Sequence, residues 1–299
     1  MRVTQGMLSQ DLIRQLNNST NRLSQLYQQL YTGKKISKPS DDPVIATLGI
    51  GYRTEVNQVD QYTRNMDEVH KWMDSSDSAL KEANDVLQRI RDLIVEASND
   101  SYSEDQRVDA EKEIEQLKKQ LGTIANTQVA GKYIFNGTNT TNPPVTVTDG
   151  DPSTVTINYD PNNVKNVNIE VSPGIKIGVN VNPANVFSQQ LFDDLDDLEN
   201  TLKGGGKGTE ISGFLDKIDG HLDNVSGTQA ELGAIENRVD LIDNRLSNQK
   251  QLATDIMAKN EDADFEKTLI DYLTQQNIHQ AALSVGSRII QPTLVDFLR

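Results

Sequence analysis

The chain has 299 residues, enough for two or three domains, and carries 29 basic against 44 acidic residues, a net charge of −15. This charge repels phosphate backbones and anionic headgroups, so we expect neither nucleic acid nor membrane partners. The chain has no cysteine, which rules out thiol catalysis, cysteine-ligated zinc, iron–sulfur clusters and disulfides. The pattern predicts no conventional signal peptide and no stretch approaching the ~20 apolar residues of a membrane span.

The first predicted element is a helix that ends near Gly33. Its seam of regularly spaced residues comprises Leu12, Leu16, Ser19, Leu23, Leu26 and Leu30. A second helix should begin at Pro43, because residues 40–42 supply N-cap side chains and proline suits the first helical turn.

Residues 52–121 contain neither proline nor glycine, which favours long helices. From Val59 to Ala97 the seam residues alternate in steps of three and four, a heptad pattern typical of coiled coils. A polar break at 99–103, with Ser103 and Gln106 as a capping box, separates this segment from a second seam over 110–124. We therefore expect an antiparallel helical hairpin.

The middle of the chain is different, because proline-bounded runs of β-branched residues predict strands near 145–148, 155–159, 167–171 and 175–179. A short helix with leucines at 191, 195, 198 and 202 follows, and then a glycine-rich link at 204–208. A further heptad seam runs over 232–256.

These elements predict a mainly α fold: a rod of long antiparallel coiled-coil helices from both chain ends, with a small inserted β-rich domain. The expected domains are a terminal coiled coil (1–42 and 257–299), disordered in the monomer, a helical rod domain (43–132 and 210–256), and an insertion with one short helix (133–209).

No catalytic, cofactor or metal site is predicted, so we expect no enzyme. The three histidines are interpreted as solvated, residues 206–207 as linker, and the acidic run 193–197 as a solvated helix face. The oxygen-rich segments 149–151 and 160–162 could hold calcium, but ordinary turns are favoured. The alternative class, a surface hydrolase with coiled-coil ends, requires a catalytic pair that the β-rich segment does not display.

The terminal helices need other helices to pack against, because neither is expected to be stable alone. The five leucines of the first seam contribute at most ~8–15 kcal/mol if fully buried. Ordering roughly 30 residues costs about 45 kcal/mol, and backbone hydrogen bonds offset only part of that. Either the two terminal helices pair only with each other, or they also pack against neighbouring subunits and fold on assembly. We favour the second interpretation.

Several segments resemble the bacterial flagellins. Residues 23–43, which end in TGKKISKPSDDP, are similar to the N-terminal signature of that family, and residues 87–95 (LQRIRDLIV) to its next helix motif. Residues 232–239 (LGAIENRV) resemble the start of its C-terminal helix, and residues 261–265 (EDADF) the break near the end of that helix. The resemblance covers about 1–140 and 210–299.

The resemblance implies a structural axial component of the flagellum that self-assembles helically. The proline at position 43, the GKYIFNG segment (131–137) and the FDDL helix (192–195) resemble the branch that joins the hook-side junction to the filament. Filament flagellin itself is the alternative. Implied partners are copies of this chain, the hook-side junction protein, flagellin, the flagellar export machinery and an export chaperone. The implied location is extracellular, reached by the flagellar type III route.

Arg89, Leu93 and Glu113 match flagellin positions used in axial packing and, in free monomers, in recognition by an innate immune receptor. Arg89 and Leu93 are four residues apart, and neither lies on the seam, so we expect both to project outward together. The interpretations left open are three solvated residues, contacts with the next subunit, or receptor binding. The predicted assembly residues are Leu12, Leu16, Leu23, Leu26, Leu30, Arg89, Leu93 and Glu113.

Overall fold

The computed structural model describes residues 5–99, 102–150 and 153–289, which form two compact units. The terminal unit comprises residues 1–58 and 249–299, and the central unit comprises residues 59–248. Packing therefore divides the chain at 58/59 and 248/249. It also places the segment 133–209 in one unit with the long helices.

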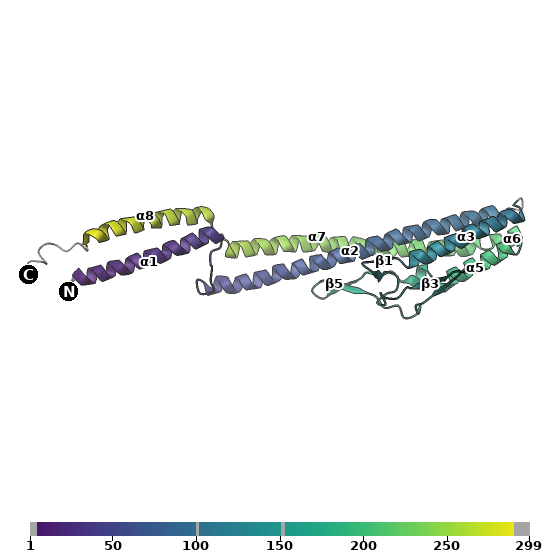
Figure 1. The fold of residues 1–299 in the computed structure, drawn as a ribbon, viewed down its shortest axis with the longest axis horizontal. Helices are drawn as coiled ribbons and strands as arrows, with labels where there is room; N and C mark the ends of the chain where they lie inside the picture. Colours follow the sequence, from purple (N-terminus) through teal and green to yellow (C-terminus); the bar gives the residue numbers. More distant parts are fainter. Residues whose placement is uncertain (1–4, 100–101, 151–152, 290–299) are drawn as a thin grey trace, which may run out of the picture. The chain divides into compact units, whose positions relative to one another are not determined.

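Helices dominate both units, and the strands lie in the central unit (Figure 1). The helices are α1 (Gln5–Thr32), α2 (Pro43–Ala97), α3 (Glu104–Ala125), α4 (Pro183–Val186), α5 (Gln189–Lys203), α6 (Gly208–Ser212), α7 (Leu215–Glu261) and α8 (Phe265–Ile289). The strands are β1 (Gln128–Val129), β2 (Lys132–Tyr133), β3 (Val145–Thr148), β4 (Thr154–Ile157), β5 (Asn168–Ser172) and β6 (Ile175–Gly178).

The predicted helix ends are confirmed by local hydrogen bonds. Helix α1 ends one residue before Gly33, whose φ of 68° is readily adopted by glycine. Helix α2 begins at Pro43, and Asp42 Oδ1 accepts hydrogen bonds from the amides of Val44 and Ile45 at 2.9 and 3.1 Å.

Two further helix breaks also lie where the sequence predicts them. Ser103 caps α3, and its side chain and that of Gln106 form the expected reciprocal capping box. Helix α7 ends at Glu261 and α8 begins at Phe265, so the break lies at the segment that resembles the flagellin break.

One hydrophobic core runs through the central unit. It joins side chains of α2, α3, α5 and α7 with those of the strands, and it includes the only tryptophan, Trp72, which is 3% exposed. The heptad seam of α2 is confirmed, since Met66, Leu80 and Ile90 are fully buried. The polar member Ser76 is also buried and donates to the Trp72 carbonyl at 2.8 Å.

The described strands form three separate antiparallel hairpins, β1–β2, β3–β4 and β5–β6. The four predicted strands are present as β3 to β6, whereas β1 and β2 were not predicted. Their two-residue turn, Ala130–Gly131, has positive φ at both positions, the backbone that a tight hairpin requires. Hairpin β3–β4 packs closely on α3: a Cβ added at Gly122 would lie 2.5 Å from Val147 Cγ2.

Candidate assembly surfaces

The seam predicted for α1 packs against α8 (Figure 1). Leu26 is 3% exposed, and the other four leucines are half-buried, namely Leu12, Leu16, Leu23 and Leu30. Ser19 Oγ lies 2.9 Å from Gln275 Nε2 and 3.1 Å from His279 Nδ1, so the polar seam position is used as well. Leu12 contacts α8 where Gly286 leaves room for it. The terminal helices therefore pair with each other.

A pair of helices can bury only one stripe of each helix, and the terminal unit leaves many large apolar side chains in solvent. Of the 19 exposed large hydrophobic residues among those described, 16 belong to the terminal unit. They are Met7, Ile13, Tyr27, Tyr31, Val44, Leu48, Ile50, Leu252, Ile256, Phe265, Leu269, Ile270, Leu273, Ile278, Leu283 and Val285. Exposed apolar side chains in such number are typical of protein interaction surfaces.

A short backbone bridge holds the two chain breaks of the terminal unit together. The Lys35 amide donates to the Glu261 carbonyl at 2.7 Å, and the Ala263 amide donates to the Gly33 carbonyl at 2.8 Å. We call this bridge, residues 33–35 with 261–263, the clasp. It fixes the start of α8 beside the end of α1.

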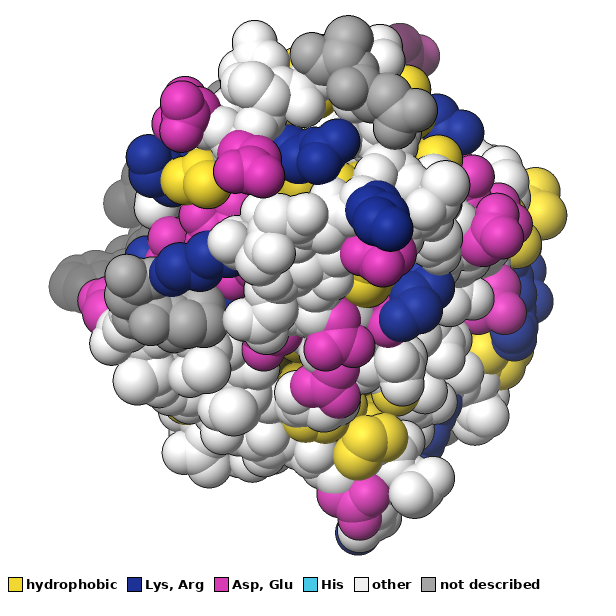
Figure 2. All heavy atoms as spheres, turned by 90° about the vertical axis from the view of Figure 1, so that its right-hand side faces the viewer, with side chains coloured by type: hydrophobic (Ala, Val, Ile, Leu, Met, Phe, Trp, Pro, Cys, Tyr) yellow, Lys and Arg dark blue, Asp and Glu magenta, His cyan; other side chains and the backbone are white. Residues whose placement is uncertain are grey.

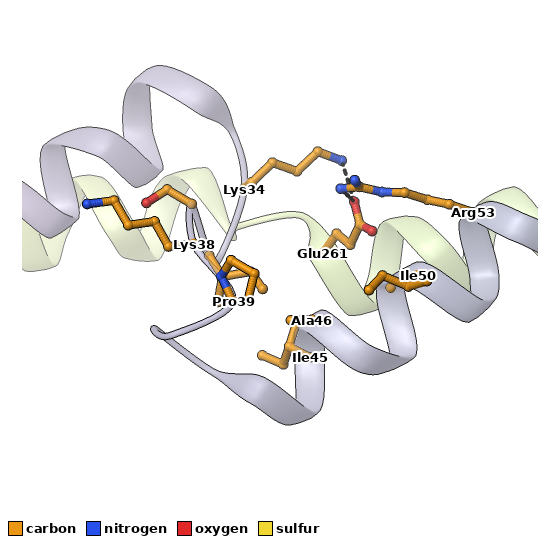
Figure 3. Close-up of a pocket in the computed structure, with 11 residues that line it drawn as sticks. Lys34, Lys38, Pro39, Ile45, Ala46, Ile50, Arg53 and Glu261 are labelled. Atoms are coloured by element: carbon orange, nitrogen blue, oxygen red, sulfur yellow. Dashed lines mark hydrogen bonds and ion pairs between the residues drawn. The ribbon is translucent and has the colours of Figure 1, made fainter.

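The Glu261 side chain reinforces the clasp (Figure 3). Its carboxylate is 5% exposed and lies 2.7 Å from Arg53 Nη2 and 3.5 Å from Lys34 Nζ. The hydrogen bond from Arg53 lowers the pKa of Glu261 below its ordinary value despite the opposing effect of burial. A Cβ at Gly49 would lie 2.6 Å from Glu261 Oε1, so only glycine fits there without a shift. A cleft opens beside this carboxylate, and it is lined by apolar side chains (Ile36, Pro39, Ile45 and Ile50) and by the cations Lys34, Lys38 and Arg53.

Arg89, Leu93 and Glu113, the three positions taken from the flagellin resemblance, differ in burial and in contacts. Arg89 Nε lies 2.7 Å from Glu113 Oε1, and both side chains are exposed, so this pair links α2 to α3 at the surface. The expectation that Leu93 projects outward beside Arg89 is wrong, since Leu93 is 2% exposed and belongs to the core. Helix α2 buries Val86 and Leu93 in addition to its heptad seam, because its apolar stripe is wider than that of a two-stranded coiled coil.

The interpretation of residues 193–197 as a solvated face is also wrong in part. Asp194 is 3% exposed, and its carboxylate lies 2.8 Å from Lys217 Nζ and 3.0 Å from His221 Nε2. Its pKa is lowered, although burial, the largest influence, acts in the opposite direction; the bonds from Lys217 and His221 outweigh it. His221, at 11% exposure, is therefore not solvated, and His279 is half-buried in the terminal unit.

An ionic cluster inside the central unit was not predicted. Lys118 is fully buried on α3, and its Nζ lies 2.6 Å from both Asp196 Oδ1 and Glu199 Oε2 on α5. Burial raises the pKa of Glu199 to about 7, against the smaller opposing effect of Lys118. The only sequence signal was that Lys118 directly follows the seam residue Leu117.

The remaining candidate sites are the oxygen-rich segments 149–151 and 160–162. Across residues 5–99, 102–150 and 153–289, no three His, Asp or Glu side chains gather as a metal site would require. Asp160 Oδ1 accepts from the Asn162 amide at 3.0 Å, an ordinary turn contact. Asp151 of the other candidate segment lies outside the described residues. Within those ranges, no helix combines the length and apolar character that a bilayer crossing needs.

Two family models match the ends of the chain. The model for the bacterial flagellin N-terminal helical region matches residues 3–140, and that for the bacterial flagellin C-terminal helical region matches residues 215–298. Together they cover well over half of the chain and flank the segment that carries β3 to β6.

Individual relatives agree with these models. Flagellar hook-associated protein 3 of Escherichia coli K12 is 32% identical over 145 residues, which are 48% of this chain and 46% of that protein. The chain thus matches about half the length of this curated relative.

Solved structures show the same fold. A putative flagellar hook-associated protein from Vibrio parahaemolyticus has a TM-score of 0.66 at 20% identity, covering 74% of this chain and all of that one. The flagellar junction protein FlgL from Legionella pneumophila has a TM-score of 0.58 at 17% identity, covering 73% and 100%.

Proposed function

This chain belongs to the bacterial flagellin family, and we propose that it is a structural, non-enzymatic component of the flagellum that joins the hook-side junction to the filament. It acts by packing against copies of itself in a helical array. The relatives that carry hook-associated or junction names support this position within the family.

The observation that carries the proposal is the uneven placement of exposed apolar side chains. Sixteen of the 19 lie on the terminal unit, eleven of them on the paired helices α1 and α8 and five on the ends of α2 and α7 that belong to this unit. Removing them from water releases roughly 25 cal/mol per Å² of apolar surface, a driving force available only through association. A hydrolase would require a pocket with a catalytic pair, whereas the exposed apolar side chains of the terminal unit support an assembly role.

The same surface serves successive partners. Copies of this chain, the hook-side junction protein and flagellin would each cover part of the terminal unit in the finished structure. Before assembly, the chain passes unfolded through the flagellar export machinery, with a chaperone shielding its apolar C-terminal helix. The finished protein is extracellular.

Localisation on isolated flagella tests this proposal against its alternative. A small epitope inserted at the exposed β5–β6 turn, next to Gly174, is labelled with gold-conjugated antibody and viewed by electron microscopy. We expect label confined to the zone between hook and filament. Label along the whole filament would identify a filament flagellin, and its absence from flagella would reject an axial role.

A further inference from the structure

The β5–β6 hairpin of the central unit has a strand edge that no described strand covers. Among the described strands, β5 and β6 pair only with each other, so each keeps a second edge. The Val179 amide donates to the Val167 carbonyl at 3.0 Å, which sets the alternation of this antiparallel ladder. The backbone N–H and C=O groups of Lys176 and Gly178 therefore face away from β5. We call this side of β6 the free edge.

The corresponding edge of β5 is already in contact with a helix. Asn65 Nδ2 on α2 donates to the Glu170 carbonyl at 2.7 Å. Glu170 lies opposite Lys176 in the ladder, so its carbonyl points away from β6, as the register requires. Within the described residues, no hydrogen bond joins β6 to α7 in a similar way.

A groove lies between the free edge and α7. Residues 176–182 line one wall in an unbroken run, and Ile175 continues that wall. The other wall is one face of α7, with residues at helical spacing that include Thr228, Leu232, Ile235, Arg238, Leu241 and Arg245. Arg238 lines both halves of the hollow, so the two halves form one groove.

The two walls have similar lengths. Positions 228–245 of α7 rise about 26 Å, and residues 175–182 span up to about 23 Å. About seven or eight residues of extended chain cover that distance. A strand laid in the groove would meet backbone groups of β6 on one side and side chains of α7 on the other, which is the arrangement of β-strand addition.

The charged side chains of the groove favour an acidic occupant. The groove is lined by one carboxylate, Glu231, and by three cations, Lys176, Arg238 and Arg245. This excess of cations lies in a unit that has 17 basic and 33 acidic residues. Ile235 and Leu241, which are 36% and 72% exposed, add apolar contacts on the α7 wall.

Asn180 adds a hydrogen-bond donor that the single chain does not use. It lines the groove, and its Oδ1 accepts from the Val167 amide at 2.7 Å. Its Nδ2 is buried and has no partner among the described residues. A buried donor without an acceptor is unfavourable, and a carbonyl group of an added strand would supply the acceptor.

We propose that an extended acidic segment of another protein adds to the free edge as a strand and fills this groove. A second copy of the chain is a poorer occupant, because each described strand is already paired in a hairpin of its own copy. The three cations bind carboxylates of the segment, and Ile235 and Leu241 contact its apolar side chains. The proposal goes beyond the flagellar role and does not depend on the position of the protein in the flagellum.

The test uses a fluorescein-labelled peptide of eight residues in which glutamate and valine alternate. Its binding to the purified full-length chain is measured by fluorescence anisotropy. We expect saturable binding, and binding at least about tenfold weaker for the same peptide with lysine in place of glutamate. Methylation of the backbone nitrogens removes the donors that strand addition needs, so the methylated peptide should not bind.

Hydrogen exchange locates the bound peptide on the chain. The amides of Lys176 and Gly178 lie on the free edge, so the peptide should slow their exchange about tenfold or more. The Ile177 amide faces β5, and its exchange should not change.

Substitutions on the α7 wall test the groove from its other side. Arg238→Glu places a carboxylate where the two halves of the groove meet and should weaken binding about tenfold or more. Arg245→Glu, seven residues along the same wall, is a second and independent variant. Lys132→Glu, at an exposed lysine of β2 outside the groove, makes the same change in net charge and should bind the peptide like the wild type.

Four results would overturn the proposal: no saturable binding of the acidic peptide, equal binding of the methylated peptide, unchanged exchange at Gly178, or wild-type affinity in both arginine variants. A peptide that instead dissociates copies of the chain, as seen by light scattering, would assign the groove to a second copy and reject the proposed occupant. The gold-labelling experiment is independent of all these results, so the position in the flagellum can stand while this site fails.

Discussion

The terminal and central units differ in net charge and in the number of large apolar side chains that they expose to water. The terminal unit has 12 basic and 11 acidic residues, and it carries 16 of the 19 exposed large apolar side chains among the described residues. The central unit has 17 basic and 33 acidic residues and keeps its apolar side chains in one core. The face shown in Figure 2 carries acidic and basic side chains with only small, separate hydrophobic areas between them.

This difference suggests that the central unit mainly determines the stability of the single chain and the terminal unit mainly its association. The central unit buries its apolar side chains within a single chain, and its net negative charge opposes nonspecific association. The terminal unit is nearly neutral, so its copies can approach without strong repulsion, and in the proposed function neighbouring subunits cover its exposed apolar side chains. We therefore expect substitutions in the two units to affect different measurements.

The largest effect should come from Leu93→Ala in the central core. Removing a leucine that is 2% exposed leaves a cavity and should lower the free energy of unfolding by about 2–5 kcal/mol. Thermal or urea denaturation measures the loss. Arg89→Ala, one turn away and exposed, is the control and should lower the stability far less, because a surface ion pair contributes little. Equal losses from the two variants would contradict the placement of Leu93.

Glu199 should give the central unit a specific pH dependence. Its folded pKa of about 7 lies above the ordinary value of 4.5, so the folded state binds its proton more tightly than the unfolded state. Stability from this group is present below about pH 4.5 and is lost as the pH rises toward 7, by up to about 3 kcal/mol.

The measurement is the free energy of unfolding between pH 5 and 8 for the wild type and for Glu199→Gln. The variant should lack the part of the pH slope that Glu199 causes. Asp197→Asn on the same helix, whose carboxylate has no contact with Lys118, serves as control. Parallel curves for wild type and Glu199→Gln would contradict the raised pKa.

Leu26→Asp should affect the terminal unit and leave the central unit intact. A carboxylate at a position 3% exposed must be buried or must separate α1 from α8, at a cost of about 2 kcal/mol or more. Limited proteolysis should then cut α1 and α8 faster, and filament attachment in cells should fall. Ser24→Asp on the exposed side of the same helix is the control. Wild-type attachment by Leu26→Asp would exclude the α1 seam from assembly.

The smallest effect should come from Glu261→Gln at the clasp. The amide retains the shape but loses the charge that holds Arg53 and Lys34, which should cost about 1–2 kcal/mol locally. Hydrogen exchange at the Ala263 amide, which donates to the Gly33 carbonyl, reports this opening directly. Asp262→Asn, with a side chain 48% exposed, should have a smaller effect. Unchanged exchange in Glu261→Gln would mean that the backbone bridge suffices.

Local rules predicted the helix boundaries well because those boundaries depend on neighbours in the sequence. Gly33, Asp42 and Ser103 each act within a few residues. Heptad spacing likewise found the buried side of α2. The spacing could not show that α2 contacts several elements at once, so Leu93 was assigned to the wrong side.

Long-range pairs were beyond prediction for a related reason. Lys118 and Glu199 are 81 residues apart, and Arg53 and Glu261 are 208 apart. Nothing local distinguishes these charges from solvated ones. The β1–β2 hairpin was missed because its strands have only two residues each, too few for an alternating pattern.

The burial of Trp72 in the central core has a practical optical consequence. It is the only tryptophan of the chain, and its indole Nε1 lies 3.3 Å from Glu68 Oε1 within the central unit. Intrinsic fluorescence excited at the indole band therefore follows the central unit alone. Tyr27, Tyr31 and Tyr272 lie in the terminal unit and are silent at that excitation. Comparing indole emission with far-ultraviolet circular dichroism would separate the melting of the two units without any added label.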